Sequence, residues 1–245
     1  MTEEVKTRGI CLRAVDYREN DRIITLLTDS YGKIAVRARG VTSPKSKLRH
    51  AATPFAFGEY ILTVKGGFYT LKTYDYSDSF PTLSENIVRY YCGAAALETV
   101  DKIDEGEVPE VEAFTRLLRF LSDLCYGGGK EGDLILYILD ILRIYGYAVS
   151  FGEYKEGNDA KYYAFDLEEG GFVASPRQGG YAVRLTADAA RLFLSYLKGE
   201  SPSAPSPYSV AEILSLLSLY VRTKTGKNLH SYFELSCLLK GETPQ

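Results

Sequence analysis

The sequence changes its hydrophobic period once, near residue 80, and this change constrains the fold more than any other feature. Before it, short runs rich in strand-forming residues partly alternate between apolar and polar; after it, apolar residues recur at helical spacing. Strands followed by helices along a chain are typical of α+β proteins. We therefore predict a β-domain over residues 1–80 and an α-helical domain over residues 81–245.

Five strands are predicted in the first part: Val5–Ala14, Arg22–Thr28, Lys33–Arg39, Phe55–Val64 and Phe68–Tyr76. The Gly66-Gly67 pair before the last strand suits a two-residue hairpin turn, because glycine tolerates the positive φ that such turns need. Five short strands with little helix between them predict a small closed barrel of the OB-fold type. An SH3-like barrel is the nearest competitor.

The second part is predicted to be helical, with a short β-ribbon insert at residues 147–181 where Tyr, Phe and Gly are frequent. Capping boxes at Thr82–Glu85 and Ser209–Glu212 predict two helix starts, and Thr186 predicts a third. Gly127-Gly128-Gly129 is expected to end a helix. The expected helices are Glu85–Ile103, Glu110–Tyr126, Asp133–Tyr145, Thr186–Lys198, Ser209–Thr223 and Ser231–Leu239.

No apolar run reaches the roughly 18–20 residues that a transmembrane helix needs. The acidic start Met1–Glu4 also lacks the basic and apolar regions of a signal peptide. We therefore expect a cytoplasmic protein that makes no contact with a membrane.

Residue types typical of catalytic and metal sites are sparse. The four cysteines are far apart and form no CxxC pair, and neither histidine lies beside a metal or nucleophile motif: Cys11, Cys92, Cys125, Cys237, His50 and His230. Thr225-Gly226-Lys227 is followed by Asn228, where a phosphate-binding loop requires Ser or Thr. We predict no catalytic residue, no metal and no cofactor. A nuclease, which would need converging carboxylates to hold metal ions, is kept as an alternative to a protein that only binds.

Positive charge is concentrated in the first part of the chain. Residues 1–80 carry 13 Lys and Arg against 9 Asp and Glu, a net charge of +4, whereas the remainder carries 16 against 23, a net charge of −7. A polyanion is attracted to the first part and mildly repelled by the second.

Residues 33–49, which we call the basic strip, contain no acidic residue and six cations: Lys33, Arg37, Arg39, Lys45, Lys47 and Arg49. In the predicted strand, Lys33, Arg37 and Arg39 share one face, because successive side chains point to opposite faces. Cations in such a row are suited to phosphate contacts, so the basic strip predicts a site for the backbone of nucleic acid. The competing explanation is an ordinary solvated face.

Six aromatic residues lie on or beside neighbouring predicted strands: Tyr31, Tyr60, Phe68, Tyr69, Tyr74 and Tyr76. Some of them are candidates for stacking on bases, as in proteins that bind single strands. Packing in the core or at the rim of the barrel is the competing explanation for most of them.

Three helical cations form a second candidate site. Arg116 and Arg119 lie opposite the apolar stripe of their predicted helix, and Arg143 lies on the next one. Basic residues beside an apolar groove suit an acidic, hydrophobic peptide tail. A solvated helix face is the alternative, because exposed arginine is common.

Several short motifs occur in a characteristic order: Tyr17–Asp21 leading into Ile24–Thr28, Tyr31-Gly32-Lys33, Arg39-Gly40-Val41, Pro44–Leu48 and Pro54-Phe55. Together with the switch to helix near residue 82, their order and spacing resemble the bacterial DNA repair family RecO over nearly the whole chain.

The resemblance implies an OB-fold followed by a helical domain, and a recombination mediator that binds single- and double-stranded DNA and anneals complementary strands. It also implies that the protein acts with RecR to help load RecA onto DNA coated by single-strand-binding protein, whose acidic C-terminal tail it recognises. By position, the family's DNA-contacting strand and loop fall on the six cations of the basic strip. The runner-up is an adaptor that acts mainly through RecR and the tail, with minor DNA contact.

One departure from the family concerns metal. Many RecO proteins carry a four-cysteine zinc motif in an insert of the helical domain. The corresponding stretch here, residues 147–180, contains no Cys and no His. We therefore predict that the ribbon forms without zinc and is held by its aromatic residues.

Overall fold

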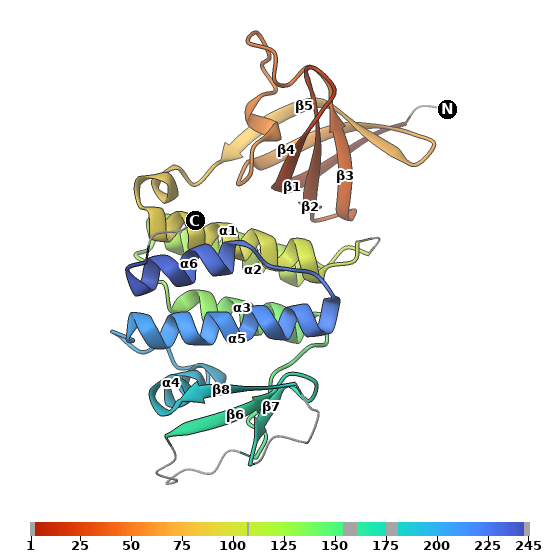
Figure 1. Cartoon of the computed structure of the whole chain (residues 1–245). Coiled ribbons are helices and arrows are strands. Elements are labelled where there is room, and N and C mark those ends of the chain that lie inside the picture. Colours follow the sequence, from red (N-terminus) through yellow and green to blue (C-terminus); the bar gives the residue numbers. More distant parts are fainter. Residues whose placement is uncertain (1–2, 107, 154–160, 175–180, 243–245) are drawn as a thin grey trace. The chain divides into compact units, whose positions relative to one another are not determined.

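A computed structural model describes residues 3–106, 108–153, 161–174 and 181–242 (Figure 1). The chain divides into two compact units: Met1–Pro81 with Asp104–Arg119, and Thr82–Ile103 with Phe120–Gln245. Helix α2 (Val111–Tyr126) contributes residues to both units. The expected domain boundary at residues 80/81 stays a prediction.

The first unit is built on a closed five-stranded barrel with the strand order β1-β2-β3-β5-β4. Its strands are β1 (Glu3–Tyr17), β2 (Asp21–Thr28), β3 (Gly32–Ala38), β4 (Phe57–Lys65) and β5 (Phe68–Asp78). All neighbours are antiparallel except β3 and β5, which pair in parallel. This OB-like barrel confirms the predicted α+β class and is favoured over the SH3-like alternative.

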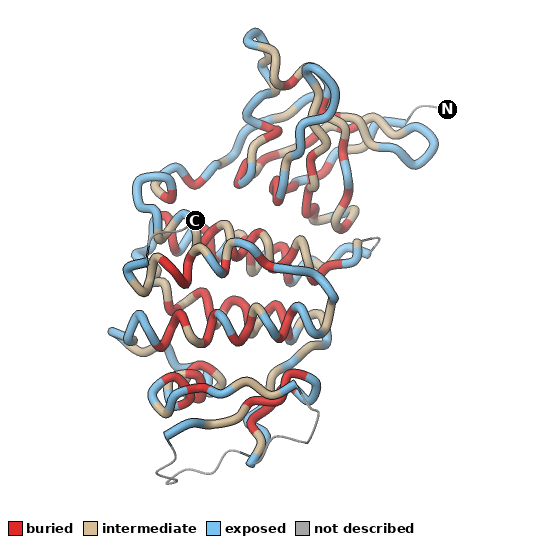
Figure 2. The backbone as a smooth tube through the Cα atoms, in the orientation of Figure 1, coloured by how far each residue is buried: buried red, intermediate tan, exposed pale blue. Residues whose placement is uncertain are grey.

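Alternation along the strands decides which side chains fill the barrel. In β3, Ile34, Val36 and Ala38 are buried while the odd-numbered residues are partly or fully exposed, and Figure 2 shows the buried positions of each strand in red. The predicted hairpin is confirmed, because Gly66 and Gly67 have φ of 58° and 80° and Lys65 pairs with Phe68 across the turn.

The segment after α1 (Ile87–Ile103) packs against the start of β3. Gly32 has φ of 65°, and a Cβ there would lie 2.8 Å from the carbonyl oxygen of Val108, so only glycine fits. The Lys33 ammonium donates to the carbonyl of Asp104. These contacts explain why the stretch Asp104–Arg119 groups with the barrel.

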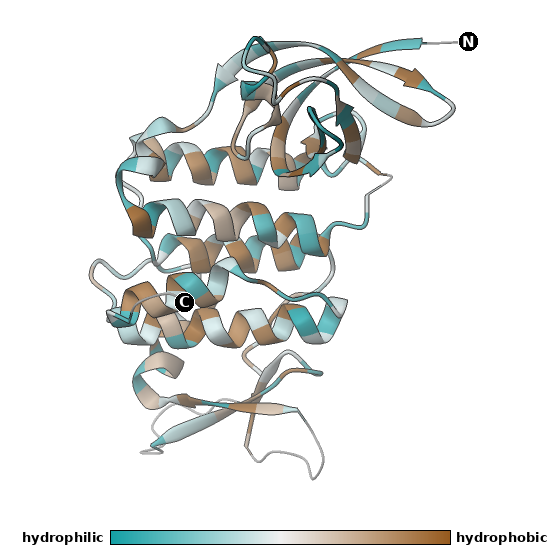
Figure 3. Ribbon diagram, turned by 45° about the horizontal axis from the view of Figure 1, so that its top comes forward, coloured by the Kyte–Doolittle hydropathy of each residue, from teal (hydrophilic) through white to brown (hydrophobic). Residues whose placement is uncertain are grey.

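The second unit is a helical bundle joined to a small sheet. Besides α1 and part of α2, its helices are α3 (Asp133–Ile144), α4 (Ala187–Leu197), α5 (Pro207–Thr225) and α6 (Ser231–Lys240). Helix α6 packs against α1 and α5, and α4 packs against α3 and α5. Figure 3 shows brown, apolar residues along these helices. Within the part of the chain that the structure describes, no helix has the length and apolar character to cross a membrane.

The predicted capping box at Thr82–Glu85 is wrong. Pro81–Glu85 forms a 3-10 turn, and α1 begins at Ile87, after the Asn86 side chain accepts a hydrogen bond from the Arg89 N–H at 3.0 Å. The Thr82 hydroxyl instead donates to the Cys125 carbonyl at 2.7 Å. A tertiary contact therefore takes the hydroxyl that the motif assigned to a cap.

The second capping box is also wrong, whereas the Thr186 cap is confirmed. Helix α5 begins at Pro207, so Ser209 lies inside its first turn; proline is favoured there because its missing N–H has no partner to lose. The Thr186 hydroxyl accepts a hydrogen bond from the Ala189 N–H at 3.3 Å and begins α4.

The β-ribbon insert has three strands in the order β7-β6-β8: β6 (Tyr162–Asp166), β7 (Gly171–Val173) and β8 (Ala182–Thr186). The last strand lies beyond the predicted limit at residue 181. Residues 154–160 and 175–180 of the predicted insert lie outside the described residues.

Aromatic rings form the core beneath this sheet. The ring of Phe165, which is fully buried, lies 5.5 Å from that of Phe172, 6.0 Å from that of Phe193 and 6.1 Å from that of Tyr220, measured between centroids. Phe193 and Tyr220 belong to α4 and α5, so the cluster joins the sheet to the bundle. Rings at such distances add packing energy to the burial of their surface.

We predict that Tyr60→Phe destabilises the barrel by about 1–3 kcal/mol, because the buried Tyr60 hydroxyl shares its one proton between the carbonyls of Ala51 and Ala56, at 3.2 and 3.1 Å. Hydrogen exchange of barrel peptides, measured by mass spectrometry, reports the change. The exposed Tyr76 provides the control Tyr76→Phe. Equal exchange in the two variants would contradict the prediction.

We also predict that Phe165→Ala lowers the stability of the ribbon and its helices by about 3–5 kcal/mol through the cavity it leaves.

A metal chelator is expected to leave the melting temperature of the wild type unchanged, because the insert offers no thiolate or imidazole ligand. Thermal melts with and without chelator test both points. A drop in melting temperature with chelator would argue against an aromatic core as the sole support.

Candidate nucleic-acid interface

A groove of about 530 Å³ lies on the outer surface of the barrel where β3 meets β5. Its lining comes from β1, β2, β3, the stretch just after β3 and the β4–β5 hairpin: Tyr17, Ile23, Ala35, Arg37, Arg39, Lys65, Phe68, Tyr69 and Thr70. The strand register explains this gathering, because Ile23 pairs with Arg37 across β2 and β3, and Arg37 pairs with Thr70 across β3 and β5. Three cations and three aromatic rings therefore surround an apolar floor.

Two of the aromatic side chains are unusually exposed for their size. Phe68 is 80% exposed at the tip of the hairpin, and Tyr17 is 40% exposed at the end of β1. Tyr69 is partly packed against the barrel core, with its ring 6.3 Å from that of Tyr31. Exposed rings beside cations are a combination found at surfaces that bind nucleic acid.

Arg37 is held by an acidic neighbour. Its Nη2 and Nε atoms donate to the Asp21 carboxylate at 2.7 and 3.1 Å, and its guanidinium lies 5.5 Å from the Tyr17 ring centroid. The bond from Arg37, with another from the Gly40 N–H, keeps the pKa of the Asp21 carboxyl below its usual value. At neutral pH the carboxylate is therefore charged and fixes the direction of Arg37.

The loop that follows β3 is tied to the barrel at its base. The Gly40 N–H donates to Asp21 at 2.8 Å, and the Thr42 N–H donates to the Asn20 carbonyl at 3.2 Å. Within the loop, Arg49 donates to the Ser43 carbonyl at 3.0 Å. These bonds shape the loop while Lys45 and Lys47 remain exposed.

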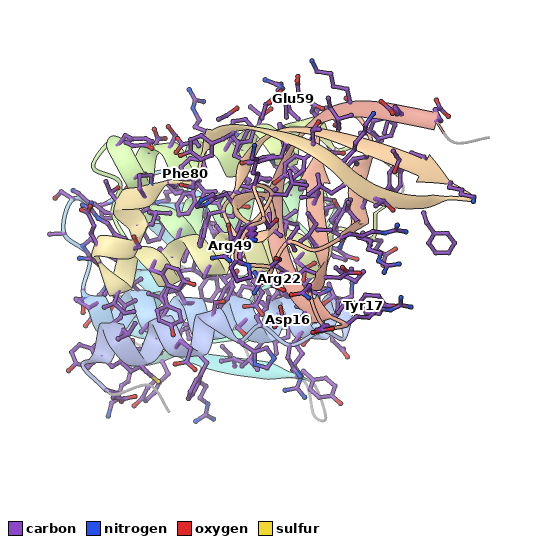
Figure 4. All side chains as sticks on the ribbon, turned by 90° about the horizontal axis from the view of Figure 1, so that it is seen from above. Asp16, Tyr17, Arg22, Arg49, Glu59 and Phe80 are labelled. Atoms are coloured by element: carbon purple, nitrogen blue, oxygen red, sulfur yellow. The ribbon has the colours of Figure 1, made fainter. Side chains whose placement is uncertain are left out.

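Figure 4 views the barrel from above, with Arg49, Arg22 and Tyr17 on one side and Glu59 on the opposite side. Arg22 supports the first side, since it is ion-paired to Asp16 at 2.8 Å and donates to the Ala52 carbonyl at 3.0 Å. The loop and the end of β1 thus lie along the same side of the barrel.

The six cations of the basic strip occupy three environments. Lys33, at the start of β3, donates to the Asp104 carbonyl. Arg37 and Arg39 line the groove. The other three lie on the loop, where Arg49 bonds to carbonyls: Lys45, Lys47 and Arg49. Sequence reasoning missed Tyr17 and Lys65, although Lys65 directly precedes the turn that aligns it with Phe68.

The aromatic residues proposed for stacking on bases also lie in different environments. Tyr60 is fully buried, and the half-buried Tyr74 donates to the Phe57 carbonyl at 3.0 Å, so both are core residues. Phe68 and Tyr69 line the groove, whereas Tyr76 is exposed elsewhere on β5.

The three candidate residues for tail binding lie in different units. Arg116 and Arg119 are on the part of α2 that belongs to the first unit, and Arg119 is exposed. Arg143 lines a pocket of about 370 Å³ in the second unit, formed mainly by apolar residues of α3 and α4 and the stretches that follow them: Leu136, Leu139, Asp140, Ala148, Val149, Tyr196, Leu197 and Gly199.

No metal centre is found in the described part of the chain, where no three His, Cys, Asp or Glu side chains gather. The four cysteines are buried, and burial raises the pKa of the Cys11 thiol to about 12. Among the described residues of the ribbon, the buried side chains are aromatic or aliphatic apart from Asp166, and residues 147–180 contain no Cys or His, so they do not fit a four-cysteine zinc site.

Comparison with known proteins agrees with this architecture. Residues 1–80 match the family model for the N-terminal part of recombination protein O, and residues 84–233 match the model for its C-terminal part. A DNA repair protein RecO of Bacillus pumilus is 32% identical over 198 residues, covering 77% of this chain and 75% of the relative. The Bacillus subtilis protein of the same name is 28% identical over 242 residues, covering 92% and 91%. The chain therefore belongs to the RecO family of DNA repair proteins.

Proposed function

We propose that the protein is a recombination mediator that binds single- and double-stranded DNA through the basic strip and the adjoining groove. It anneals complementary strands and, with RecR, helps load RecA onto DNA coated by single-strand-binding protein. The observation that carries the proposal is the gathering of Arg37, Arg39 and Lys65 around an apolar, aromatic groove beside the exposed Lys45 and Lys47.

Charge gives this surface its affinity. Each phosphate that a cation neutralises releases counterions, so several cations on one side of the barrel give strong, salt-sensitive binding that does not depend on sequence. The net charge of −7 over the remaining residues directs a polyanion toward the barrel. Binding and annealing need positioned charges and no covalent chemistry, so the proposed role is not enzymatic.

A second proposed contact is with the acidic tail of single-strand-binding protein. The pocket lined by Arg143 offers aliphatic walls to apolar tail residues, and the Arg143 guanidinium, 4.0 Å from the Asp140 carboxylate in the same lining, is the cation offered to the acidic ones. Arg116 and Arg119 remain candidates for the same role in the first unit.

The basic strip is tested by the triple substitution Arg39→Ala/Lys45→Ala/Lys47→Ala, which spares the cations bonded within the protein. The slope of log affinity against log salt for single-stranded DNA should fall in magnitude by about 2, because each lost phosphate contact contributes roughly 0.7. Fluorescence anisotropy at several salt concentrations measures both affinity and slope.

The matched control is Lys6→Ala/Arg8→Ala/Lys72→Ala, which removes three ion-paired cations of β1 and β5 outside the basic strip. An unchanged affinity and slope in the first triple variant, or equal losses in both, would reject the basic strip as the binding site. Cleavage of DNA by the wild type with magnesium or manganese would favour a nuclease instead.

The tail contact is tested by Arg143→Glu, which should weaken binding of the tail peptide about ten-fold, equivalent to roughly 1.4 kcal/mol. Arg191→Glu is the control, because Arg191 and Arg143 each lie near an aspartate three residues earlier, at 2.6 and 4.0 Å. Calorimetric titration with the peptide distinguishes them. Tight peptide binding together with millimolar DNA affinity would support an adaptor in place of a DNA-binding mediator.

A further inference from the structure

At the groove, the outer face of the barrel is apolar, whereas a solvated sheet face is usually polar. Ile23 and Ala35 form the floor of the groove, and Val15, which pairs with Ile23 on the neighbouring strand, is 49% exposed. The opposite face of the same strands supplies the barrel core, so these residues are not needed there. The floor of the groove is therefore a partly exposed apolar surface that is available to a ligand.

The walls of the groove are flat rings rather than branched aliphatic side chains. Phe68 directly follows the Gly66-Gly67 turn, and two guanidinium groups lie near the Tyr17 ring, with the Cζ atoms of Arg18 and Arg37 at 5.1 and 5.5 Å from its centroid. Planar walls suit a planar, π-rich ligand. The volume of about 530 Å³ lies in the range of pockets that hold small organic groups.

We infer that this groove seats an unpaired nucleobase, held flat against Tyr17 and Phe68 while Arg37, Arg39 and Lys65 contact the flanking phosphates. The inference rests on the proposed DNA-binding function and names the part of DNA that the groove recognises. An acidic, apolar peptide is the other ligand that a rim of cations would attract, but it has no need of planar walls.

A groove that seats a base favours single-stranded over double-stranded DNA. In a duplex the bases are paired and stacked on one another, so their faces are unavailable to protein rings, whereas an unpaired base exposes both faces. The cations on the loop after β3 contact phosphates of either form. The groove therefore adds affinity for single strands only, and a base held there is kept from pairing until it leaves.

The test is the double variant Tyr17→Ala/Phe68→Ala, in which both side chains are exposed and neither belongs to the barrel core. Its affinity for a single-stranded oligonucleotide should fall about ten-fold, while its affinity for a duplex, and for an abasic strand of equal length and charge, should stay within two-fold of the wild type. A 2-aminopurine base in the single strand should change its fluorescence on binding to the wild type and not to the variant. Tyr76→Ala removes an exposed ring outside the groove and should change none of these values.

The outcomes separate the inference from the proposed function. If the basic-strip triple variant loses affinity and the aromatic double variant does not, the groove does not seat a base although the protein binds DNA there. If neither variant loses affinity, the proposed DNA site itself is wrong. If the double variant retains single-strand binding but loses a peptide of acidic and apolar residues, the groove is a peptide site and the inference is overturned.

Discussion

Two residue pairs close the barrel, and the first unit depends on them. Val36 pairs with Tyr69 and Arg37 with Thr70, in the only parallel contact among the barrel strands described. Without this contact β3 and β5 would be sheet edges with unpaired backbone groups. The same two pairs bring the tip of the β4–β5 hairpin beside the outward face of β3, so the interaction that completes the fold also forms the groove.

The Asp21 carboxylate has a comparable role within the candidate interface. One of its oxygens accepts from Arg37 and the other from the Gly40 N–H, so one side chain positions both the groove and the base of the basic loop. An acidic residue beside cations reduces their net charge, yet a fixed guanidinium loses less conformational freedom when it meets a phosphate. The site therefore gains order at a small cost in charge.

In the helical unit, aromatic packing stabilises the small three-stranded sheet. A three-stranded sheet of short strands has little surface to bury by itself. Here Phe165 and Phe172 pack against Phe193 and Tyr220 of the bundle, and Asp166 accepts from two backbone N–H groups of the β6–β7 turn, from Glu168 at 2.8 Å and Glu169 at 2.9 Å. Side-chain packing thus joins this small sheet to the bundle.

The sequence by itself determined the features that depend on local pattern. Runs of strand-forming residues identified the five strands, and clean alternation in the third separated Lys33, Arg37 and Arg39 from Ile34, Val36 and Ala38, which the structure buries, because side chains of a strand point alternately to its two sides. Gly66-Gly67 specified the hairpin turn through its positive φ angles, and the motif order identified the RecO family.

Features that depend on pairs distant in sequence were decided only by the tertiary structure. The parallel register of β3 and β5 brought Lys65 and Phe68 to Arg37, and packing of the 104–109 segment engaged Lys33 with Asp104, because no local pattern encodes which distant backbone will lie alongside a strand.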